Sequence, residues 1–239
     1  MWLWIAAALL SAFVKGLCGM GDAPVFTSML AFSNDNIDIT PVSLLVSLPN
    51  NLIIAWKERS GLKKSVWLPM SIVMVIASFT GILILKNADT RVIKNIFAVF
   101  IMFVGLYMLI NELRHSRRKI PKIGLTVIGI LSGLGCGLFA IGALLGAYVS
   151  QVTDNSHEFK SNLCMIFAIE NTFRFFTCLS LGILTRTVVE RAIMLYPFIL
   201  IGLFAGMRSS RWLDERKAKI LVDVMLIVSG AVLLIGNMN

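Results

Sequence analysis

Residues 15–24 read KGLCGMGDAP and follow directly on a run of apolar residues, 2–14. A lysine, three glycines, an aspartate and a proline interrupt the apolar run within this short stretch. A helix that spans a bilayer needs about 20 apolar residues. The segments on either side of Lys15, 2–14 and 16–32, are both shorter than that. The first hydrophobic segment is therefore predicted to be a helix broken at its glycines.

The composition places the chain in a membrane. Hydrophobic residues make up 57% of its 239 residues and charged residues only 15%. The mean hydropathy of +0.84 is well above that of a soluble domain of this size. Apolar runs such as residues 66–85 are long enough to cross a bilayer. We expect a multi-pass protein of the inner cell membrane, in contact with lipid.

Several classes of function have no support in the sequence. The 22 Lys and Arg residues outnumber the 13 Asp and Glu residues, but they fall mostly in short connectors and form no soluble basic face for nucleic acid. Neither H-E-x-x-H nor G-x-S-x-G occurs, so we do not expect an enzyme. The four cysteines lack C-x-x-C spacing and the two histidines lack metal-ligand spacing. We therefore expect no metal and no cofactor.

The chain is one repeat used twice. A shift of 121 residues aligns Leu10-Ser11 with Leu131-Ser132 and Gly16-Leu17 with Gly137-Leu138. Each half is predicted to hold a glycine-rich segment and three hydrophobic helices, at residues 41–57, 65–86 and 91–113 in the first half and 159–184, 190–208 and 217–236 in the second. The predicted organisation is a first membrane repeat at 1–113, a basic connector at 114–121 and a second membrane repeat at 122–239.

The basic residues of the connectors distinguish two paths for the glycine-rich segments. If each segment re-enters the side from which it came, 15 basic residues lie on one side of the membrane and 5 on the other. If each segment crosses, the numbers are 11 and 9. Because basic residues gather on the cytoplasmic side, the re-entrant path is favoured, with the crossing path as the alternative.

Three crossings in each half place the two halves in opposite orientations. The predicted fold is an all-α polytopic membrane protein of two inverted repeats, each a glycine-rich re-entrant or broken helix plus three transmembrane helices. Broken helices that meet near the midplane are a recurring feature of secondary transporters. Their N-terminal N–H groups favour an anion. KGLCGMGDAP is therefore predicted to form an apex beside an anion site.

Ionisable groups inside apolar segments are costly and mark candidate functional residues. Glu170 and Arg174 are four residues apart and so share one face of the helix at 159–184. Either they form a structural pair, or Arg174 presents its N–H donors to an anion while Glu170 balances it or carries a proton. Lys15 is expected to extend toward the membrane surface. Asp22 is expected to cap the second half-helix, with a proton-carrying role as the alternative.

The repeat also pairs polar residues of the two halves. A shift of 120 residues aligns Glu170-Asn171 with Asn50-Asn51. Pro49 interrupts the helical hydrogen bonds beside these two amides. We expect a substrate site near the pseudo-two-fold axis, with a packing kink and interhelical amide bonds as the alternative. The predicted substrate-binding residues are Gly16, Gly19, Gly21, Asp22, Asn50, Asn51, Gly137, Gly142, Glu170, Asn171 and Arg174.

GLCGMGDAP in the first half and SGLGCGLFAIGALLGAY in the second resemble the glycine-rich segments of the sulfite exporter TauE/SafE family. The similarity continues through HEFKSNLCMIFAIENTFRFFTCLSLGIL, where Lys160, Phe167, Arg174 and Gly182 fit the family's pattern. Asp22 departs from it and stands where the family commonly has a glycine or another small residue. The resemblance implies a membrane transporter of small sulfur-containing anions.

The expected function is secondary transport of a small organic or inorganic anion, sulfite- or sulfonate-like, with protons as a candidate coupling ion. The alternatives are an anion channel, a membrane-embedded enzyme and a structural membrane protein. A homo-oligomer is a candidate assembly.

Overall fold

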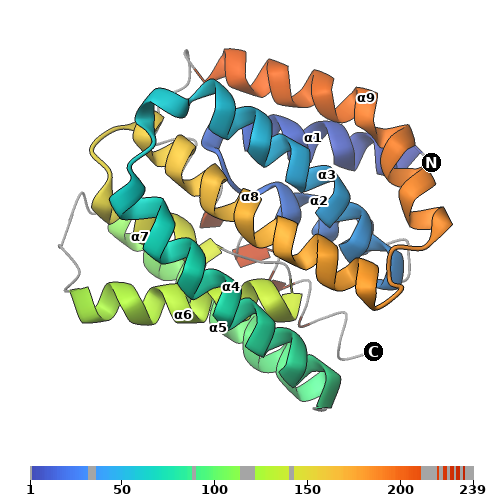
Figure 1. Ribbon diagram of the computed structural model, residues 1–239, viewed down its shortest axis with the longest axis horizontal. Helices are drawn as coiled ribbons and strands as arrows, with labels where there is room; N and C mark the ends of the chain where they lie inside the picture. The colour runs from blue at the N-terminus through green and yellow to red at the C-terminus, as the bar shows by residue number, and fades with distance from the viewer. Residues whose placement is uncertain are drawn as a thin grey trace.

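A computed structural model of the chain describes residues 2–31, 36–87, 90–113, 122–139 and 143–210, with scattered positions between 220 and 234. Over these residues the regular elements are helices, and no strand occurs (Figure 1). They are α1 (Trp2–Cys18), α2 (Asp22–Ala31), α3 (Asn36–Lys57), the short η1 (Arg59–Gly61), α4 (Lys64–Asn87), α5 (Thr90–Leu113), α6 (Lys122–Phe139), α7 (Ala143–Val152), α8 (Ser156–Ser180) and α9 (Arg186–Ser209).

The structure confirms the predicted all-α class. Each half begins with two short helices, α1 and α2 or α6 and α7, at its glycine-rich segment, and longer helices follow. The helix expected at 41–57 begins earlier, at Asn36, so that Pro41 as well as Pro49 lies inside α3. The predicted basic connector at 114–121 lies outside the described residues. The helix predicted at 217–236 is described only at scattered positions.

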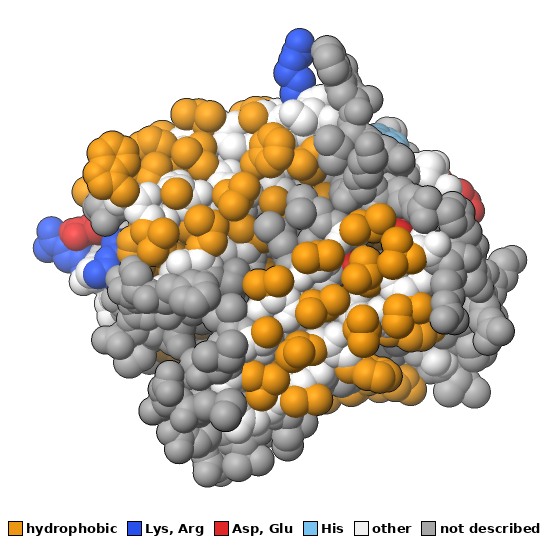
Figure 2. Space-filling model, turned by 180° about the vertical axis from the view of Figure 1, so that it is seen from behind, with side chains coloured by type: hydrophobic (Ala, Val, Ile, Leu, Met, Phe, Trp, Pro, Cys, Tyr) orange, Lys and Arg blue, Asp and Glu red, His pale blue; other side chains and the backbone are white. Residues whose placement is uncertain are grey.

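The described helices have the length and the surface of a membrane protein. Three of them contain segments long and apolar enough to cross a bilayer, namely Ile39–Lys57, Ser156–Ser180 and Arg186–Ser209. Large hydrophobic side chains cover their outer faces, and Trp56 and Ile193 are 71% and 65% exposed. Figure 2 shows hydrophobic side chains spread over one face of the molecule, with most charged side chains at its rim. An apolar surface of this extent fits contact with lipid.

The central pair of helices is α3 and α8, which pack against each other in the middle of the molecule (Figure 1). On one side of this pair α1 packs against α9, and on the other side α6 packs against α4. In addition, α3 contacts α9 and α8 contacts α4. In the repeat, α1, α3 and α4 correspond to α6, α8 and α9. The contact of α1 with α9 therefore corresponds to that of α6 with α4, and the contact of α3 with α9 corresponds to that of α8 with α4.

Glycines bring the paired helices to close backbone contact. Gly202 and Gly206 are one turn apart on α9 and lie directly against α1. A Cβ atom at Gly206 would lie 2.1 Å from the carbonyl oxygen of Phe13, and one at Gly202 would lie 2.4 Å from that of Leu9. Gly133 of α6 lies against α4 in a similar way. Small residues at this spacing let helices associate in lipid, where no hydrophobic effect drives them together.

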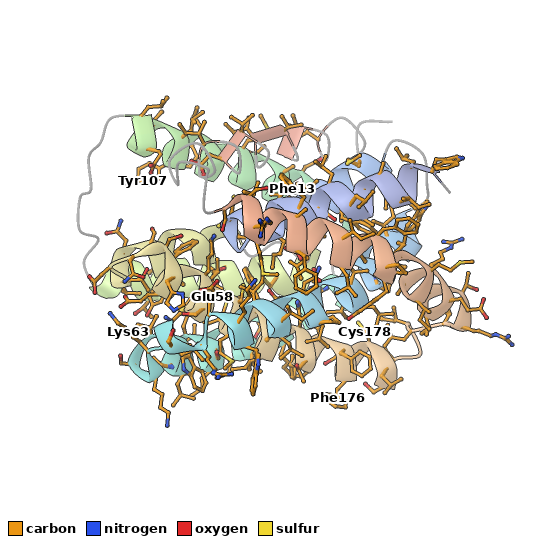
Figure 3. The ribbon with its side chains drawn as sticks, turned by 90° about the horizontal axis from the view of Figure 1, so that it is seen from above. Phe13, Glu58, Lys63, Tyr107, Phe176 and Cys178 are labelled. Atoms are coloured by element: carbon orange, nitrogen blue, oxygen red, sulfur yellow. The ribbon has the colours of Figure 1, made fainter. Side chains whose placement is uncertain are left out.

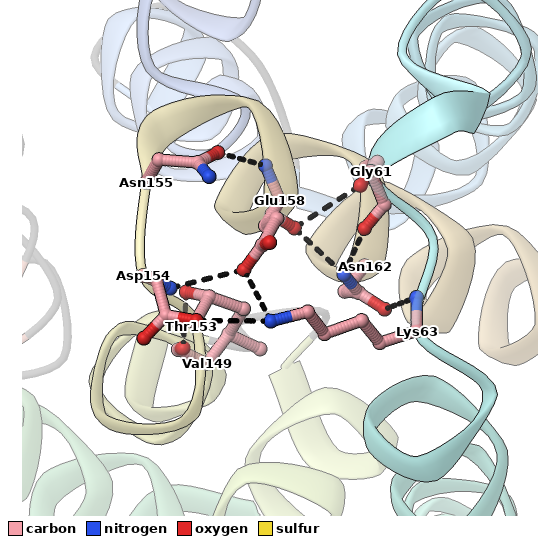
Figure 4. A network of polar contacts seen from close by, with 9 residues as sticks. Gly61, Lys63, Val149, Thr153, Asp154, Asn155, Glu158 and Asn162 are labelled. Carbon is pink, nitrogen blue, oxygen red and sulfur yellow. Dashed lines mark hydrogen bonds and ion pairs between the residues drawn. The ribbon is translucent and has the colours of Figure 1, made fainter.

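An ion-pair network joins the two halves at the connector between α3 and α4 (Figure 4). The Lys63 ammonium lies 2.7 Å from Glu158 Oε2 and 3.0 Å from Asp154 Oδ2. Its hydrogen bonds to Glu158 and to Asp154 raise the pKa of Lys63, so it keeps its charge throughout the neutral range. Figure 3 shows Lys63 at one end of the molecule, with Phe176 and Cys178 toward the opposite end.

Further hydrogen bonds strengthen this join. The Asn162 amide donates to the carbonyl oxygen of Gly61 at 2.9 Å (Figure 4). The His157 ring contacts Glu58 through Nδ1 and lies 2.6 Å from Ser60 Oγ through Nε2. The α3–α4 connector and the α7–α8 connector therefore lie together at one end of the bundle.

Candidate functional site

Two glycines form the break between α1 and α2. Gly19 and Gly21 have φ angles of 80° and 90°, in the left-handed region that residues with a Cβ atom rarely adopt. The chain then turns back, because α2 packs along α1 and the Phe26 ring lies 5.8 Å from the Trp4 ring. The structure confirms the predicted break, as a tight turn between two arms.

This turn lies nearer one end of α8 than the expected midplane position. The Cys164 thiol donates to the Gly19 carbonyl oxygen at 3.4 Å, and a Cβ atom at Gly19 would lie 3.1 Å from Lys160 Cγ. Cys164 precedes Arg174 by about 15 Å of helical rise. The structure thus separates the turn glycines from Arg174, which the sequence analysis placed at one site.

Lys15 and Asp22 form a buried ion pair across the turn. Lys15 Nζ lies 3.0 Å from Asp22 Oδ1, and Lys15 is only 1% exposed. The expectation that Lys15 extends toward the membrane surface is therefore wrong. Asp22 Oδ2 accepts a hydrogen bond from Ser47 of α3, and the Lys15 ammonium lies 5.1 Å from the centre of the Phe167 ring. The sequence analysis omitted Lys15 from the site, although an acid on the far side of a glycine turn was a signal for this pair.

Glu170 and Arg174 share one buried face of α8, as predicted. Arg174 Nε lies 3.8 Å from Glu170 Oε1, which is an ion-pair distance but not a hydrogen bond. The same Glu170 oxygen accepts a hydrogen bond from Ser78 Oγ of α4 at 2.9 Å. Within the described part of the chain, the contact with Glu170 is the single polar contact of the Arg174 guanidinium. Most of its N–H donors therefore have no acceptor among the residues that the structure describes.

The paired amides of α3 are buried and unpartnered. Asn50 and Asn51 are each 1% exposed. Over the described residues, neither the nitrogen nor the oxygen of either side-chain amide has a hydrogen-bond partner. They follow Ser47 by three and four residues and so share its face of the helix. Buried polar groups nearly always have partners, and the interhelical bonds considered above do not form among the described residues.

Cys136 lies near both the Glu170–Arg174 pair and Lys15. It lies in α6, is 2% exposed, and is within electrostatic range of Glu170, Arg174 and Lys15. The shift of 121 residues that reveals the repeat aligns it with Lys15. Cys136 therefore lies near charged side chains of both halves of the chain. Asn171 is also buried, at 7% exposure.

The remaining predicted site residues are glycines. Gly16 packs against α9, where its Cβ atom would lie 2.4 Å from a backbone carbonyl oxygen. Gly137 lies in α6, where only its backbone is described, and Gly142 lies outside the described residues. The two glycine-rich segments touch each other. A Cβ atom at Gly146 of α7 would lie 2.7 Å from the sulfur atom of Met20, which is in the turn between α1 and α2.

These features define a helical membrane protein whose interior holds buried charges and unpartnered amides. Among the described residues, no group of three or more His, Cys, Asp or Glu side chains is placed to hold a metal ion. The chain belongs to the sulfite exporter TauE/SafE family, whose sequence profile matches residues 4–233. Members of this family are membrane transporters. No curated protein and no solved structure matches the chain significantly.

Proposed function

We propose that the protein is a secondary transporter of a small anion of the sulfite or sulfonate class and that Arg174 binds this anion. The observation that carries the proposal is a guanidinium only 7% exposed whose single polar contact with the described residues is 3.8 Å long. A guanidinium presents five N–H donors in a planar fork, which suits a compact cluster of anionic oxygens. The family membership supports the same class of substrate.

A purely structural pairing of Glu170 with Arg174 has less support. A buried ion pair offsets the desolvation of its two charges only when its geometry is excellent and further hydrogen bonds satisfy both groups. Here the two groups are 3.8 Å apart, and the hydrogen bond of Glu170 goes to Ser78 instead. Glu170 thus balances the charge of Arg174 without occupying its donors, as a counter-ion must if the arginine is to take up and release an anion.

Three buried amides add neutral contacts to the proposed site. Asn50 and Asn51 lie on α3, which packs against α8, and Asn171 lies beside Glu170 on α8. Their N–H groups are donors for anion oxygens, and they add no charge that would hold the anion too tightly for release. We assign these three amides to the path of the anion through the interior.

We place the two halves in opposite orientations, with each glycine-rich segment as a re-entrant hairpin. If both segments crossed the membrane, the α3–α4 and α7–α8 connectors would lie on opposite sides, and the ion pair of Lys63 with Asp154 argues against this. The first hairpin opens where α9 begins, since Arg191 lies 5.4 Å from the Trp4 ring. Inverted repeats of this kind move against each other to open one site to either side in turn.

Cysteine labelling tests this topology. We expect Ser60→Cys and Asn155→Cys, each in a background without the four native cysteines, to react from the cytoplasmic side. Ile183→Cys, in the turn between α8 and α9, is the matched control and is expected to react from the other side. Membrane-impermeant maleimides applied to intact cells and to inverted vesicles give the readout. Labelling of positions 60 and 155 from opposite sides would show that the glycine-rich segments cross.

The proposed function itself is tested by exchange of labelled sulfite across proteoliposomes that contain the purified protein. A carrier is expected to saturate and to exchange labelled for unlabelled anion, because its site faces one side at a time.

A further inference from the structure

The Lys15–Asp22 pair lies in the interior yet is not used by the anion site around Arg174. Lys15 is 1% exposed and Asp22 is 7% exposed. Their side chains are 3.0 Å apart, and the remaining carboxylate oxygen of Asp22 accepts a hydrogen bond from Ser47. The pair is well formed, unlike that of Glu170 and Arg174. Lys15 and Asp22 also come from the two arms of one hairpin, so the pair bridges the glycine turn.

The surroundings of the pair indicate a second place for an anion. Asn50 and Asn51 follow Ser47 on the same face of α3, and their amides have no partners among the described residues. Unpartnered amide donors therefore lie one helical turn from a hydroxyl that is bonded to Asp22. A structural ion pair alone gives no reason to leave two buried amides unsatisfied beside it.

Other titratable groups approach this pair from neighbouring helices. Cys164 and Lys160 approach it from α8, and Cys164 is within electrostatic range of both Lys15 and Asp22. Cys136 approaches Lys15 from α6. The thiols are neutral at neutral pH in their ordinary form. Two further carboxylates lie near these thiols, because the buried Asp223 is within electrostatic range of Cys18 and Glu58 is within range of Cys164. Asp22 is the carboxylate in direct contact with Lys15.

We propose that Asp22 takes up the coupling proton, and that its protonation releases Lys15 to bind the transported anion. This inference rests on the proposed function. In the empty state the positive charge of Lys15 balances the negative charge of Asp22. When a proton binds one carboxylate oxygen of Asp22, the anion replaces that carboxylate beside Lys15, with Asn50 and Asn51 as further donors. The cluster is neutral in both states, so one proton moves with each monovalent anion and no net charge crosses the membrane.

The test measures proton uptake on anion binding by the full-length protein in detergent. The probe is methanesulfonate, which does not titrate near neutral pH, so any proton taken up belongs to the protein. Calorimetric titrations in two buffers of different ionisation enthalpy give the number of protons bound with the anion. The wild type is expected to take up one proton per anion and to bind more weakly as the pH rises, since the proton and the anion bind together.

Three variants separate the roles of the pair. Asp22→Asn resembles the protonated carboxyl group, so it is expected to bind methanesulfonate without proton uptake and with an affinity that does not depend on pH. Its unpaired Lys15 is expected to lower the melting temperature, and the anion is expected to restore it. Lys15→Gln combined with Asp22→Asn keeps the cluster neutral. This double variant is expected to fold but to lose the methanesulfonate binding that the Lys15 ammonium provides. Glu190→Gln, a surface change on α9, is the matched control and is expected to retain proton uptake.

Two results would overturn the inference and leave the proposed function standing. One is binding of methanesulfonate by the wild type without proton uptake. The other is normal, pH-dependent proton uptake by Asp22→Asn or by the neutral double variant, which would place the proton elsewhere, for example on Glu170. Failure of the folded wild type to bind methanesulfonate at all would remove the sulfonate class from the proposed function and this inference with it.

Discussion

Arg174→Lys is expected to weaken binding of sulfite and methanesulfonate by roughly 10- to 100-fold, although it keeps the positive charge. An ammonium cannot reproduce the planar fork of a guanidinium, and the loss of one hydrogen bond to a charged group is worth about 1.5–3 kcal/mol. Binding is measured as the rise in melting temperature of the purified protein with ligand concentration. Equal affinity of the lysine variant and the wild type would remove the guanidinium fork from the site.

A neutral double variant distinguishes binding from structure at the same position. Arg174→Ala alone leaves the Glu170 carboxylate buried without a counter-ion, so a loss of function there would be ambiguous. Glu170→Gln combined with Arg174→Gln removes both charges and is expected to give a monodisperse protein that has lost the anion site at Arg174 and does not transport. Near-normal transport by this double variant would show that the pair is structural.

Gly206→Leu is expected to prevent the protein from folding. A Cβ atom at this position would lie 2.1 Å from the carbonyl oxygen of Phe13 and 3.1 Å from the Cα atom of Gly16. Overpacking typically costs about 1–3 kcal/mol, and the cost is at least at the upper end here because two backbones, not flexible side chains, must separate.

The matched control for this change is Ala205→Leu. Ala205 is the neighbouring residue on α9 and lies on its exposed surface, so leucine there is expected to face lipid and to be tolerated. Elution profile and melting temperature in detergent provide the measurement. A Gly206→Leu protein with the elution profile and melting temperature of the wild type would contradict the close packing of α1 on α9.

The helices could be predicted because hydropathy and glycine spacing are local properties of the sequence. The break at Gly19 and Gly21 follows from apolar arms that are too short to span a bilayer. The partners of these arms could not be read in the same way. Gly202 and Gly206 show the spacing of a helix-packing motif, but nothing in their own segment indicates that they meet α1, which is about 190 residues away in the chain.

The candidate site was predictable only where one helix determines it. The shared face of Glu170 and Arg174 follows from their spacing of four residues, and the structure confirms it. Lys15 and Asp22 are joined across a turn, where helical periodicity no longer relates one residue to the next, and the sequence therefore assigned Lys15 to the surface. The hydrogen bond of Ser78 to Glu170 depends on packing between α4 and α8, which only the fold determines.

Counterflow of labelled sulfite tests the central claim most directly. Proteoliposomes with the purified protein are loaded with unlabelled sulfite and diluted into a trace of labelled sulfite, with empty liposomes and the Glu170→Gln, Arg174→Gln protein as controls. The account predicts transient accumulation of label that saturates with external sulfite and requires unlabelled sulfite inside. Flux that rises linearly with concentration and needs no internal sulfite would indicate a channel, and the absence of flux through folded wild-type protein would contradict the proposed transport of sulfite.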